Sequence, residues 1–407
     1  MKYKTYKIKD LINEISMGPF GSNIKVECFV DSGIPVLNGS NLTGFALNDN
    51  SFRYVTPEKA DSLGKANAYR GDIVITHRGT LGQIVFIPEN SKHSRYVISQ
   101  SQFRVKCNEK ILPEYLVYYF HTNAGQHKLL SNASQVGVPA LARASTTFQT
   151  LEIDIPDVTE QRKIVDLLET IREKIELNNA INNNLEQQAQ AIFKSWFVDF
   201  DPFGGNRPID WITGIVDDLG AEIICGKTPS TKKKEYYGGN TPFITIPDMH
   251  GCVYNVSTER YLSAAGVASQ PKKTLPHNTV CISCIGTAGL VTLVSEKSQS
   301  NQQINSIVPK EGISAYYIYL LMQTLSETIN KLGQSGSTIV NLNKTQFGKI
   351  PVPIPSEQVL CNFDTLCKPL FEMILSNQKE NIKLANLRDT LLPKLMAGEL
   401  DVSDLDL

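Results

Sequence analysis

The sequence lacks the features that mark several large classes of protein. No stretch of its 407 residues reaches the eighteen or so apolar residues that a membrane helix needs, and the first seven residues have no apolar core of a signal peptide. Eight cysteines lie scattered without framework spacing, which is typical of reduced thiols in a reducing compartment rather than of disulfides. We therefore expect a cytoplasmic protein that does not bind a membrane.

Motifs of catalysis are also scarce. Neither Gly-x-Gly-x-x-Gly nor the Asn/Asp-Pro-Pro-aromatic motif of amino-methyltransferases occurs, and the six histidines form no paired catalytic set. The stretch from Ala221 to Thr228 resembles a phosphate-binding loop, but its interior is apolar and Pro229 follows at once, so we reject it. Cys281 and Cys284 lie in an apolar, strand-like run without a second ligand pair, which favours core cysteines over a zinc site. We predict no catalysis, metal or bound cofactor for this chain.

What the sequence does contain is an internal repeat. Residues 34–37 match residues 241–244, and residues 76–82 match residues 283–289, both at an offset of 207. At residues 155–156 against 354–355 the offset has fallen to 199, so the second copy is shorter in between. The repeat predicts two related globular copies that differ in detail.

Charge follows the repeat, although the net charge of the whole chain is only −1. Net charges are +4 for residues 1–155, −4 for 156–205, +3 for 206–353 and −4 for 354–407. This alternation indicates two mildly basic globular copies, suited to phosphate contact, and two acidic connecting segments.

The connecting segments are predicted to be long helices, because their apolar residues recur at alternating steps of four and three. The first seam is Ile164, Leu168, Ile171, Ile175, Asn178, Asn182, Leu185, Ala189, Ile192 and Trp196. The second, 199 residues later, is Phe363, Cys367, Leu370, Ile374, Asn377, Asn381, Leu384, Arg388, Leu391 and Leu395. This is a coiled-coil pattern, although each helix packing on its own globular copy remains an alternative.

Both seams carry two asparagines at matching positions. If the helices run antiparallel, Asn178 falls opposite Asn381 and Asn182 opposite Asn377, and the paired amides fix the register. The 33 residues from Ile164 to Trp196 span about 50 Å as a helix. In the second helix, we expect Pro369 to cause a kink or a restart and Pro393 to end the helix.

Within each globular copy, short β-rich runs at residues 71–76 and 279–283 and helical patches at residues 113–130 and 314–332 predict an α+β domain with a twisted sheet. The loops between them are rich in side chains that read base edges or hold phosphates. One polar loop alone is more often solvated surface, but these loops correspond between the copies. The candidate DNA contacts of the first copy are Ser22, Asn23, Lys25, Asn41, His77, Arg78, Gln100, Gln102, Gln135 and Arg143. Those of the second are Lys227, Thr228, Ser230, Lys232, Lys233, Lys234, His250, Gln302 and Lys344.

Several motifs together carry a resemblance to a known family. They are Gly-Pro-Phe-Gly-Ser at 18–22, Gly-Ile-Pro-Val at 33–36, Gly-Lys-Thr-Pro-Ser at 226–230, Tyr-Tyr-Gly-Gly at 236–239, and Ile-Pro followed by Glu-Gln at 155–161 and 354–358. With the helix exits at residues 193–200 and 391–400, the chain resembles the specificity subunits of Type I restriction-modification systems over essentially its whole length. One departure is Cys361-Asn362-Phe363 with Cys367, where apolar residues are usual.

The resemblance implies two target recognition domains, at residues 1–156 and 201–353, each followed by a spacer helix, at 157–200 and 354–407. It also implies double-stranded DNA as a ligand and two methyltransferase and two ATP-dependent translocase-nuclease subunits as partners. S-adenosylmethionine and ATP with magnesium would then bind to those partners.

Two other functions remain open at this point. The chain could be a stand-alone bipartite DNA-binding regulator, which would bind DNA alone and support no methylation. It could also be a protein-interaction scaffold, in which case alanine at Lys232, Lys233 and Lys234 would change nothing.

Overall fold

The computed structural model describes residues 2–134, 137–334 and 340–402, which form two compact units. Unit 1 consists of Met1–Glu173 with Asn386–Leu407, and unit 2 is Lys174–Ala385. Each unit contains one copy of the repeat. Two helices, α5 (Val158–Phe197) and α11 (Glu357–Met396), each contribute residues to both units. Within the described residues, no helix is long and apolar enough to cross a membrane.

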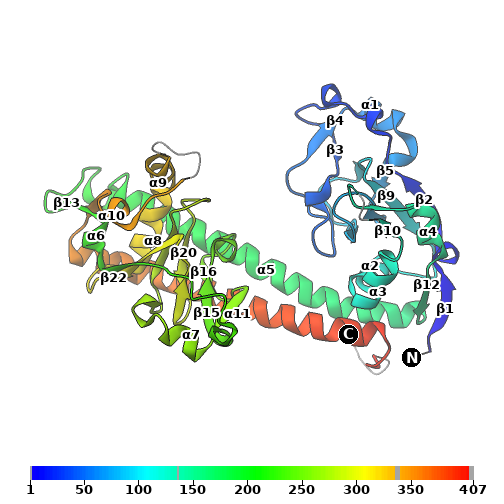
Figure 1. Cartoon of the computed structure of the whole chain (residues 1–407). Helices are drawn as coiled ribbons and strands as arrows, with labels where there is room; N and C mark the ends of the chain where they lie inside the picture. Colours follow the sequence, from blue (N-terminus) through cyan, green and yellow to red (C-terminus); the bar gives the residue numbers. More distant parts are fainter. Residues whose placement is uncertain (1, 135–136, 335–339, 403–407) are drawn as a thin grey trace. The chain divides into compact units, whose positions relative to one another are not determined.

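Unit 1 contains two four-stranded sheets, ordered β2-β9-β6-β7 and β4-β3-β8-β5 (Figure 1). Their strands are β2 (Ile12–Met17), β3 (Ile34–Val36), β4 (Arg53–Val55), β5 (Asn67–Tyr69), β6 (Ile73–Thr76), β7 (Ile84–Phe86), β8 (Arg95–Val97) and β9 (Gln102–Cys107). Two antiparallel pairs stand apart from them, β1 (Lys4–Lys7) with β12 (Glu152–Ile155) and β10 (Ala133–Ser134) with β11 (Ala140–Leu141). The helices are α1 (Pro57–Ser62), α2 (Pro113–His121), α3 (Asn123–Leu129) and α4 (Ala144–Thr150), with short 3-10 turns η1 (Ile8–Asp10), η2 (Gly21–Asn23), η3 (Val26–Cys28), η4 (Gly39–Asn41) and η5 (Gly64–Ala66).

Unit 2 repeats this topology, with the sheets β14-β22-β19-β20-β16 and β17-β15-β21-β18. Its strands are β13 (Ile212–Ile215), β14 (Gly220–Cys225), β15 (Tyr237–Ile244), β16 (Tyr254–Asn255), β17 (Arg260–Leu262), β18 (Thr274–Leu275), β19 (Val280–Ser283), β20 (Val291–Val294), β21 (Ser298–Ser300), β22 (Ile304–Pro309) and β23 (Pro351–Ile354). Its helices are α6 (Val216–Leu219), α7 (Ala264–Ala268), α8 (Ala315–Thr324), α9 (Ser326–Gly333) and α10 (Lys344–Gly348), with 3-10 turns η6 (Asp201–Phe203), η7 (Lys234–Tyr236), η8 (Ile246–Met249) and η9 (Pro271–Lys273). The α+β prediction is confirmed for both copies.

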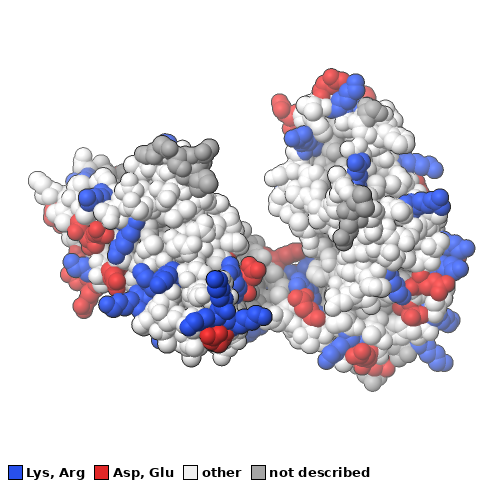
Figure 2. All heavy atoms as spheres, viewed as in Figure 1, with Lys and Arg blue, Asp and Glu red and all other residues white. Residues whose placement is uncertain are grey.

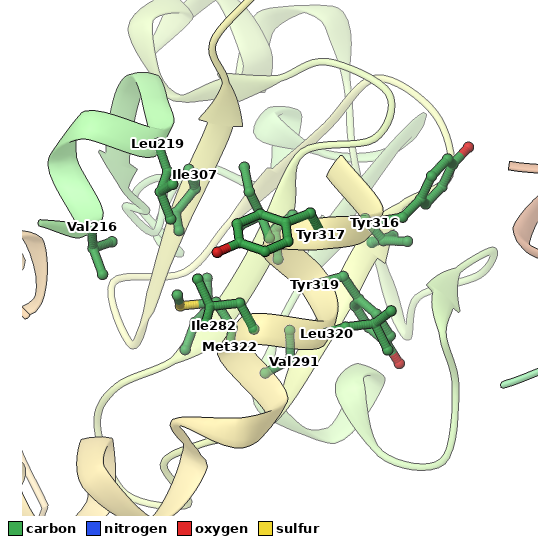
Figure 3. Close-up of a cluster of buried hydrophobic side chains, with 14 of the residues drawn as sticks. Val216, Leu219, Ile282, Val291, Ile307, Tyr316, Tyr317, Tyr319, Leu320 and Met322 are labelled. Carbon is green, nitrogen blue, oxygen red and sulfur yellow. The ribbon is translucent and has the colours of Figure 1, made fainter. Parts of the chain in front are cut away.

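The strands predicted from sequence lie at the centre of each sheet because their residues are apolar on both faces. All four residues of β6 and of β19 are buried. In unit 2 the tyrosine-rich helix α8 packs on β19 and β20, and its side chains meet Ile282, Val291 and Ile307 (Figure 3).

Cys281 and Cys284 are both buried in the cores of this unit, as predicted.

The shortening of the second copy falls at particular connections. β6 and β7 match β19 and β20 at an offset of 207, whereas β8 matches β21 at 203 and β9 matches β22 at 202. The offset reaches 199 only at β12 and β23. The central strands are therefore kept, and the differences lie in the connections.

The helices α5 and α11 run antiparallel along their predicted seam. Within unit 2, Asn178 donates a hydrogen bond to Asn381 at 2.8 Å, and Asn377 donates one to Asn182 at 2.9 Å. All ten predicted seam positions in each helix are buried or half-buried. The predicted pairing of the amides is therefore confirmed. The family departure at Cys367 is accommodated, because this thiol is fully buried.

The structure contradicts the prediction that Pro393 ends the second helix. α11 is a single helix through Pro369 and Pro393 to Met396, so it does not restart at Pro369 either. A proline removes only one N–H from the helical ladder. Leu392 and Leu395, which flank Pro393, are buried in the core of unit 1, and this packing holds the last turn in place.

A glycine ends α11 instead. Gly398 has φ +74°, and its N–H donates to the Leu395 carbonyl at 3.2 Å. The next N–H, that of Glu399, donates to the Lys394 carbonyl at 2.9 Å, which completes a Schellman motif. Tyr3 donates its hydroxyl to the Leu395 carbonyl at 2.9 Å, so the beginning of the chain is bonded to this helix end.

Candidate nucleic-acid interface

Several loops of unit 1 meet at one end of the sheet that contains β6. They follow β2, follow β6, precede β9 and lie on both sides of β11. Three backbone hydrogen bonds tie them together: Gly18 N–H to the Gln102 carbonyl at 2.8 Å, His77 N–H to the Ser101 carbonyl at 2.8 Å, and Gly79 N–H to the Pro139 carbonyl at 2.9 Å. We call these loops the unit 1 loop cluster.

Unit 2 has the same arrangement, which we call the unit 2 loop cluster. Its backbone bonds join Gly226 N–H to the Ile304 carbonyl at 3.0 Å, Cys284 N–H to the Gln303 carbonyl at 2.8 Å, and Gly286 N–H to the Val340 carbonyl at 3.0 Å. In both units the second residue after the central strand, β6 or β19, forms an isolated bridge, Arg78 with Ala140 and Ile285 with Asn341. Two sequences that differ in most positions thus build one loop framework.

The first glycine of each cluster is required by close approach of the backbone. A Cβ on Gly18 would lie 1.9 Å from the carbonyl oxygen of Ser99, and one on Gly226 would lie 2.1 Å from that of Asn301. No real side chain tolerates these distances, so both positions need glycine. This explains physically why both copies begin their loop motif with glycine.

Most of the predicted DNA contacts are exposed. In unit 1 the exposed ones are Asn23, Lys25, Arg78, Gln100 and Arg143. In unit 2 they are Lys227, Ser230, Lys232, Lys233, Lys234, His250, Gln302 and Lys344. Arg78, Gln100 and Arg143 belong to the unit 1 loop cluster, and Lys227, Gln302 and Lys344 lie in or beside the unit 2 loop cluster. These side chains are placed where a ligand can reach them.

Two of the predicted contacts have a different role in the structure. Asn41 is fully buried, and its amide donates to the carbonyls of Asn48 and Asn50 at 3.1 and 2.8 Å. Gln102 is 1% exposed and accepts a hydrogen bond from Ser99 N–H at 2.9 Å. Their polar groups hold loops in place, so these two predictions are corrected: neither amide is free to face DNA.

Three other predicted residues are partly engaged. His77 is half-buried with its Nε2 3.1 Å from the Gln100 carbonyl oxygen, and burial lowers its pKa below the usual value, which favours the neutral ring. Thr228 donates its hydroxyl to the side chain of Gln302 at 2.7 Å. His250 is exposed but lines a hollow of about 510 Å³ beside Asn381 of α11, away from the loop cluster.

Two predicted contacts cannot be placed by their side chains. Gln135 lies outside the described residues. Ser22 lies within η2, and its side chain is likewise not described.

Sequence reasoning missed three exposed polar residues of the clusters. Thr80 and Thr287 follow the glycines Gly79 and Gly286, whose φ angles are +91° and +78°, at the tips of equivalent loops. Asn341 is exposed beside its bridge to Ile285. The repeated Gly-Thr pair at an offset of 207 was a signal that could have identified the two threonines.

The exposed groups of the clusters are of the kinds that contact nucleic acids. Their exposed groups are guanidinium, ammonium, amide and hydroxyl groups, which bond to phosphate oxygens and base edges. Within the described residues, no group of three or more His, Cys, Asp or Glu side chains is arranged to hold a metal ion.

Lysines gather on one surface of unit 2. Figure 2 shows Lys and Arg side chains grouped where α7 lies in Figure 1. Helix α7 packs on η7, which follows Lys232 and Lys233 and begins at Lys234. This part of unit 2 therefore carries a group of positively charged side chains.

Comparisons with known proteins show the family of the chain. A family model described as the Type I restriction modification DNA specificity domain matches residues 2–187 and 208–362. The chain is 33% identical to the Type I restriction enzyme HindI specificity subunit of Haemophilus influenzae, over 88% of this chain and 93% of that protein. It is 24% identical to the Type I restriction enzyme MjaIX specificity subunit of Methanocaldococcus jannaschii, over 98% and 94%.

A solved structure supports the fold independently. The crystal structure of the Type-I restriction-modification system S subunit from M. genitalium matches with a TM-score of 0.62 at 15% identity, over 97% of this chain and 96% of that one. The repeat, the paired helices and the family model all agree. The chain belongs to the family of specificity subunits of Type I restriction-modification systems.

Proposed function

We propose that the two loop clusters are the DNA-reading surfaces, each for one half of a bipartite target. The observation that carries this proposal is the equivalence of the two clusters: the same loops, at the same end of the same sheet, expose different polar side chains. One framework with two sets of side chains is what two unlike half-sites require.

The types of the exposed side chains suggest which of them contact bases and which contact phosphates. Arg78 has the planar donor pair that suits the O6 and N7 of guanine, and the amides of Gln100 and Gln302 suit adenine. Lys227 and Lys344 suit phosphates. Thr80, Thr287 and Asn341 join the set as candidates because of their exposure.

In this proposal α5 and α11 set the distance between the half-sites. Half-sites about one helical turn of DNA apart would lie on the same face of the duplex. The bonded asparagine pairs keep the two helices in register, so the spacing would be fixed rather than adjustable.

Catalysis would belong to partner subunits acting in the cytoplasm. Two methyltransferase subunits, which bind S-adenosylmethionine, would methylate adenines in DNA that this chain positions. Two restriction subunits, which use ATP and magnesium, would translocate and cut. This chain would hold no cofactor of its own.

A strip of exposed apolar side chains on the helices of unit 2 is our candidate surface for the methyltransferase. Leu177, Ile181, Leu366 and Met373 are 55, 37, 47 and 51% exposed. Their heptad positions put them on one side of the helix pair. The other side packs on the unit 2 body, where Glu186 accepts the Tyr319 hydroxyl at 2.8 Å. Exposed apolar strips on otherwise polar helices are typical of a protein interface.

The docking proposal is tested by charge insertion. The double variant Leu177→Glu with Met373→Glu should fail to co-purify with the methyltransferase, because two carboxylates would be desolvated in the interface. Gln187→Glu with Lys379→Glu, at exposed positions on the backs of the same helices, is the matched control and should co-purify normally. Normal co-purification of the first variant would place the docking surface elsewhere.

The proposed function is tested by expressing the chain with its methyltransferase partner and sequencing for methylated adenines. We expect one bipartite motif with a fixed spacer, changed in one half by Arg78→Ala and in the other by Gln302→Ala. DNA binding by the lone chain without any methylation would favour a regulator. Loss of neither binding nor methylation in these variants would favour a scaffold.

A further inference from the structure

A group of six lysines of unit 2 comes from segments that contact one another beside the loop cluster. We call this the lysine surface; its members are Lys227, Lys232, Lys233, Lys234, Lys272 and Lys273. All are exposed except Lys273, which is half-buried. They come from the loop after β14, from η7 and from η9. The close grouping of Lys and Arg in Figure 2 lies in this part of the unit.

The backbone beneath the lysine surface is firmly held. The Gln270 amide donates to the Lys227 carbonyl at 2.6 Å, which fixes the start of η9 against the loop after β14. The Ser263 N–H donates to the Tyr236 carbonyl at 3.0 Å, and a Cβ on Gly266 would lie 2.2 Å from that same oxygen. α7 and η7 therefore touch through backbone atoms, and the lysines project from a preformed platform.

Few acidic groups neutralise these lysines. Among the described residues, no ion pair involves Lys232, Lys234 or Lys272. Lys233 lies over the ring of Tyr236, 5.0 Å from its centroid, and the Tyr236 hydroxyl 3.1 Å away helps to raise the pKa of this ammonium group. The surface is thus a field of uncompensated positive charge at neutral pH.

Unit 1 has no equivalent surface. At the corresponding positions it carries Pro19, Ile24, Lys25, Val26, Glu27, Lys65 and Ala66, with two lysines against one glutamate, a net charge of +1. The unit 2 positions have six lysines against Glu235, a net charge of +5. Lys25 also pairs with Glu27 at 3.6 Å. The two copies share a fold but not this charge.

We propose that the lysine surface is a sequence-independent site for the phosphate backbone of duplex DNA, made of other side chains than those proposed to read bases. Lysine ammonium groups bind phosphates as point charges and lack the rigid donor fork that reads a base pair. This inference rests on the proposed function. Its consequence is an unequal pair of domains, in which unit 2 supplies most of the salt-dependent affinity and unit 1 mainly discriminates sequence.

The test measures the binding of the full chain to duplex DNA across a range of salt concentrations. The triple variant Lys232→Gln, Lys272→Gln, Lys273→Gln removes three ammonium groups and leaves the Lys233–Tyr236 contact intact. The control variant Lys310→Gln, Lys368→Gln, Lys379→Gln removes three exposed lysines from the same unit. The probes are a labelled duplex with the methylated motif and one of random sequence.

Each phosphate contact contributes about −0.9 to the slope of log affinity against log salt. The slope of the triple variant should therefore be shallower than that of wild type by about 2.7. When the salt concentration rises fourfold, the affinity of wild type should fall by a factor about 40 times larger than the affinity of the variant does. The loss should be equal on both probes, the methylated motif should stay unchanged, and the control should match wild type.

Other outcomes overturn the proposal in distinguishable ways. An unchanged slope would show that the lysines do not contact phosphates. A loss confined to the motif probe, with an altered methylated motif, would make them base readers and leave the proposed function standing. If the wild-type chain binds neither probe and supports no methylation, the proposed function fails together with this inference.

Discussion

The buried asparagine pair of Asn182 and Asn377 offers the sharpest test of how this fold is specified. The two side chains are 8 and 9% exposed, and the Asn377 amide donates to the Asn182 carbonyl oxygen at 2.9 Å. Replacing Asn182 by leucine would leave a buried amide donor without this partner. Replacing both by leucine would extend the apolar seam.

The size of the stability change depends on whether one amide of the pair is removed or both. An unsatisfied buried polar group costs about 1–3 kcal/mol, so Asn182→Leu and Asn377→Leu should each destabilise the helix pair of unit 2 by roughly this amount. The double variant should be close to neutral or more stable than wild type, because both polar groups are removed together. The double-mutant cycle should therefore give a coupling energy of about 2 kcal/mol or more.

Hydrogen exchange of the α5 and α11 amides near the pair is the measurement, because it reports local opening of this helix pair. Asn183→Leu, at an exposed neighbouring position on α5, is the control and should change protection by less than about 0.5 kcal/mol. A double variant that is destabilised by the sum of its single variants would refute the reasoning. It would show that the two amides are energetically independent.

Three further predictions concern unit 1. Arg104 and Asp72 form a buried ion pair with their side chains 6 and 3% exposed, so Arg104→Met should cost about 3–5 kcal/mol in thermal unfolding, and adding Asp72→Asn should restore much of it. The Arg388 guanidinium lies 5.0 Å from the Phe45 ring centroid. Arg388→Met should lower the free energy of opening at the end of α11, measured by hydrogen exchange, by about 0.5–2 kcal/mol, and Arg388→Lys should lower it less. Burial lowers the pKa of His121, so below about pH 6.5 the unfolded chain takes up a proton before the folded one. The melting temperature should consequently fall between pH 7.5 and 5.5, and His121→Gln should reduce that fall.

The elements that sequence predicted well are those with long periodic signals. The seam from Ile164 to Trp196 repeats at regular steps, so it specified a helix, its buried face and the partner of Asn178. The proline prediction failed because it used local propensity alone. Packing of Leu395 around the last turn of α11 outweighs the hydrogen bond that Pro393 removes.

The loops were predictable in type but not residue by residue. Asn41, Gln102 and Arg78 look alike in sequence, as polar residues in polar loops. Whether a side chain faces solvent or binds backbone depends on how its own loop folds: Gln102 binds Ser99, three residues away, and Asn41 binds the carbonyls of Asn48 and Asn50. Amides that brace a loop and amides that remain free therefore cannot be separated by spacing alone.

The core of unit 1 has a consequence for the order of synthesis. Residues 1–173 of this unit are translated before unit 2, yet Leu392, Leu395 and Met396 of α11 belong to its core. The early part of the unit must wait, with apolar surface uncovered, until all of unit 2 has been translated. A chain that stops before residue 390 would keep that surface open. The last few turns of α11 thus make the completion of the first domain conditional on the synthesis of the second.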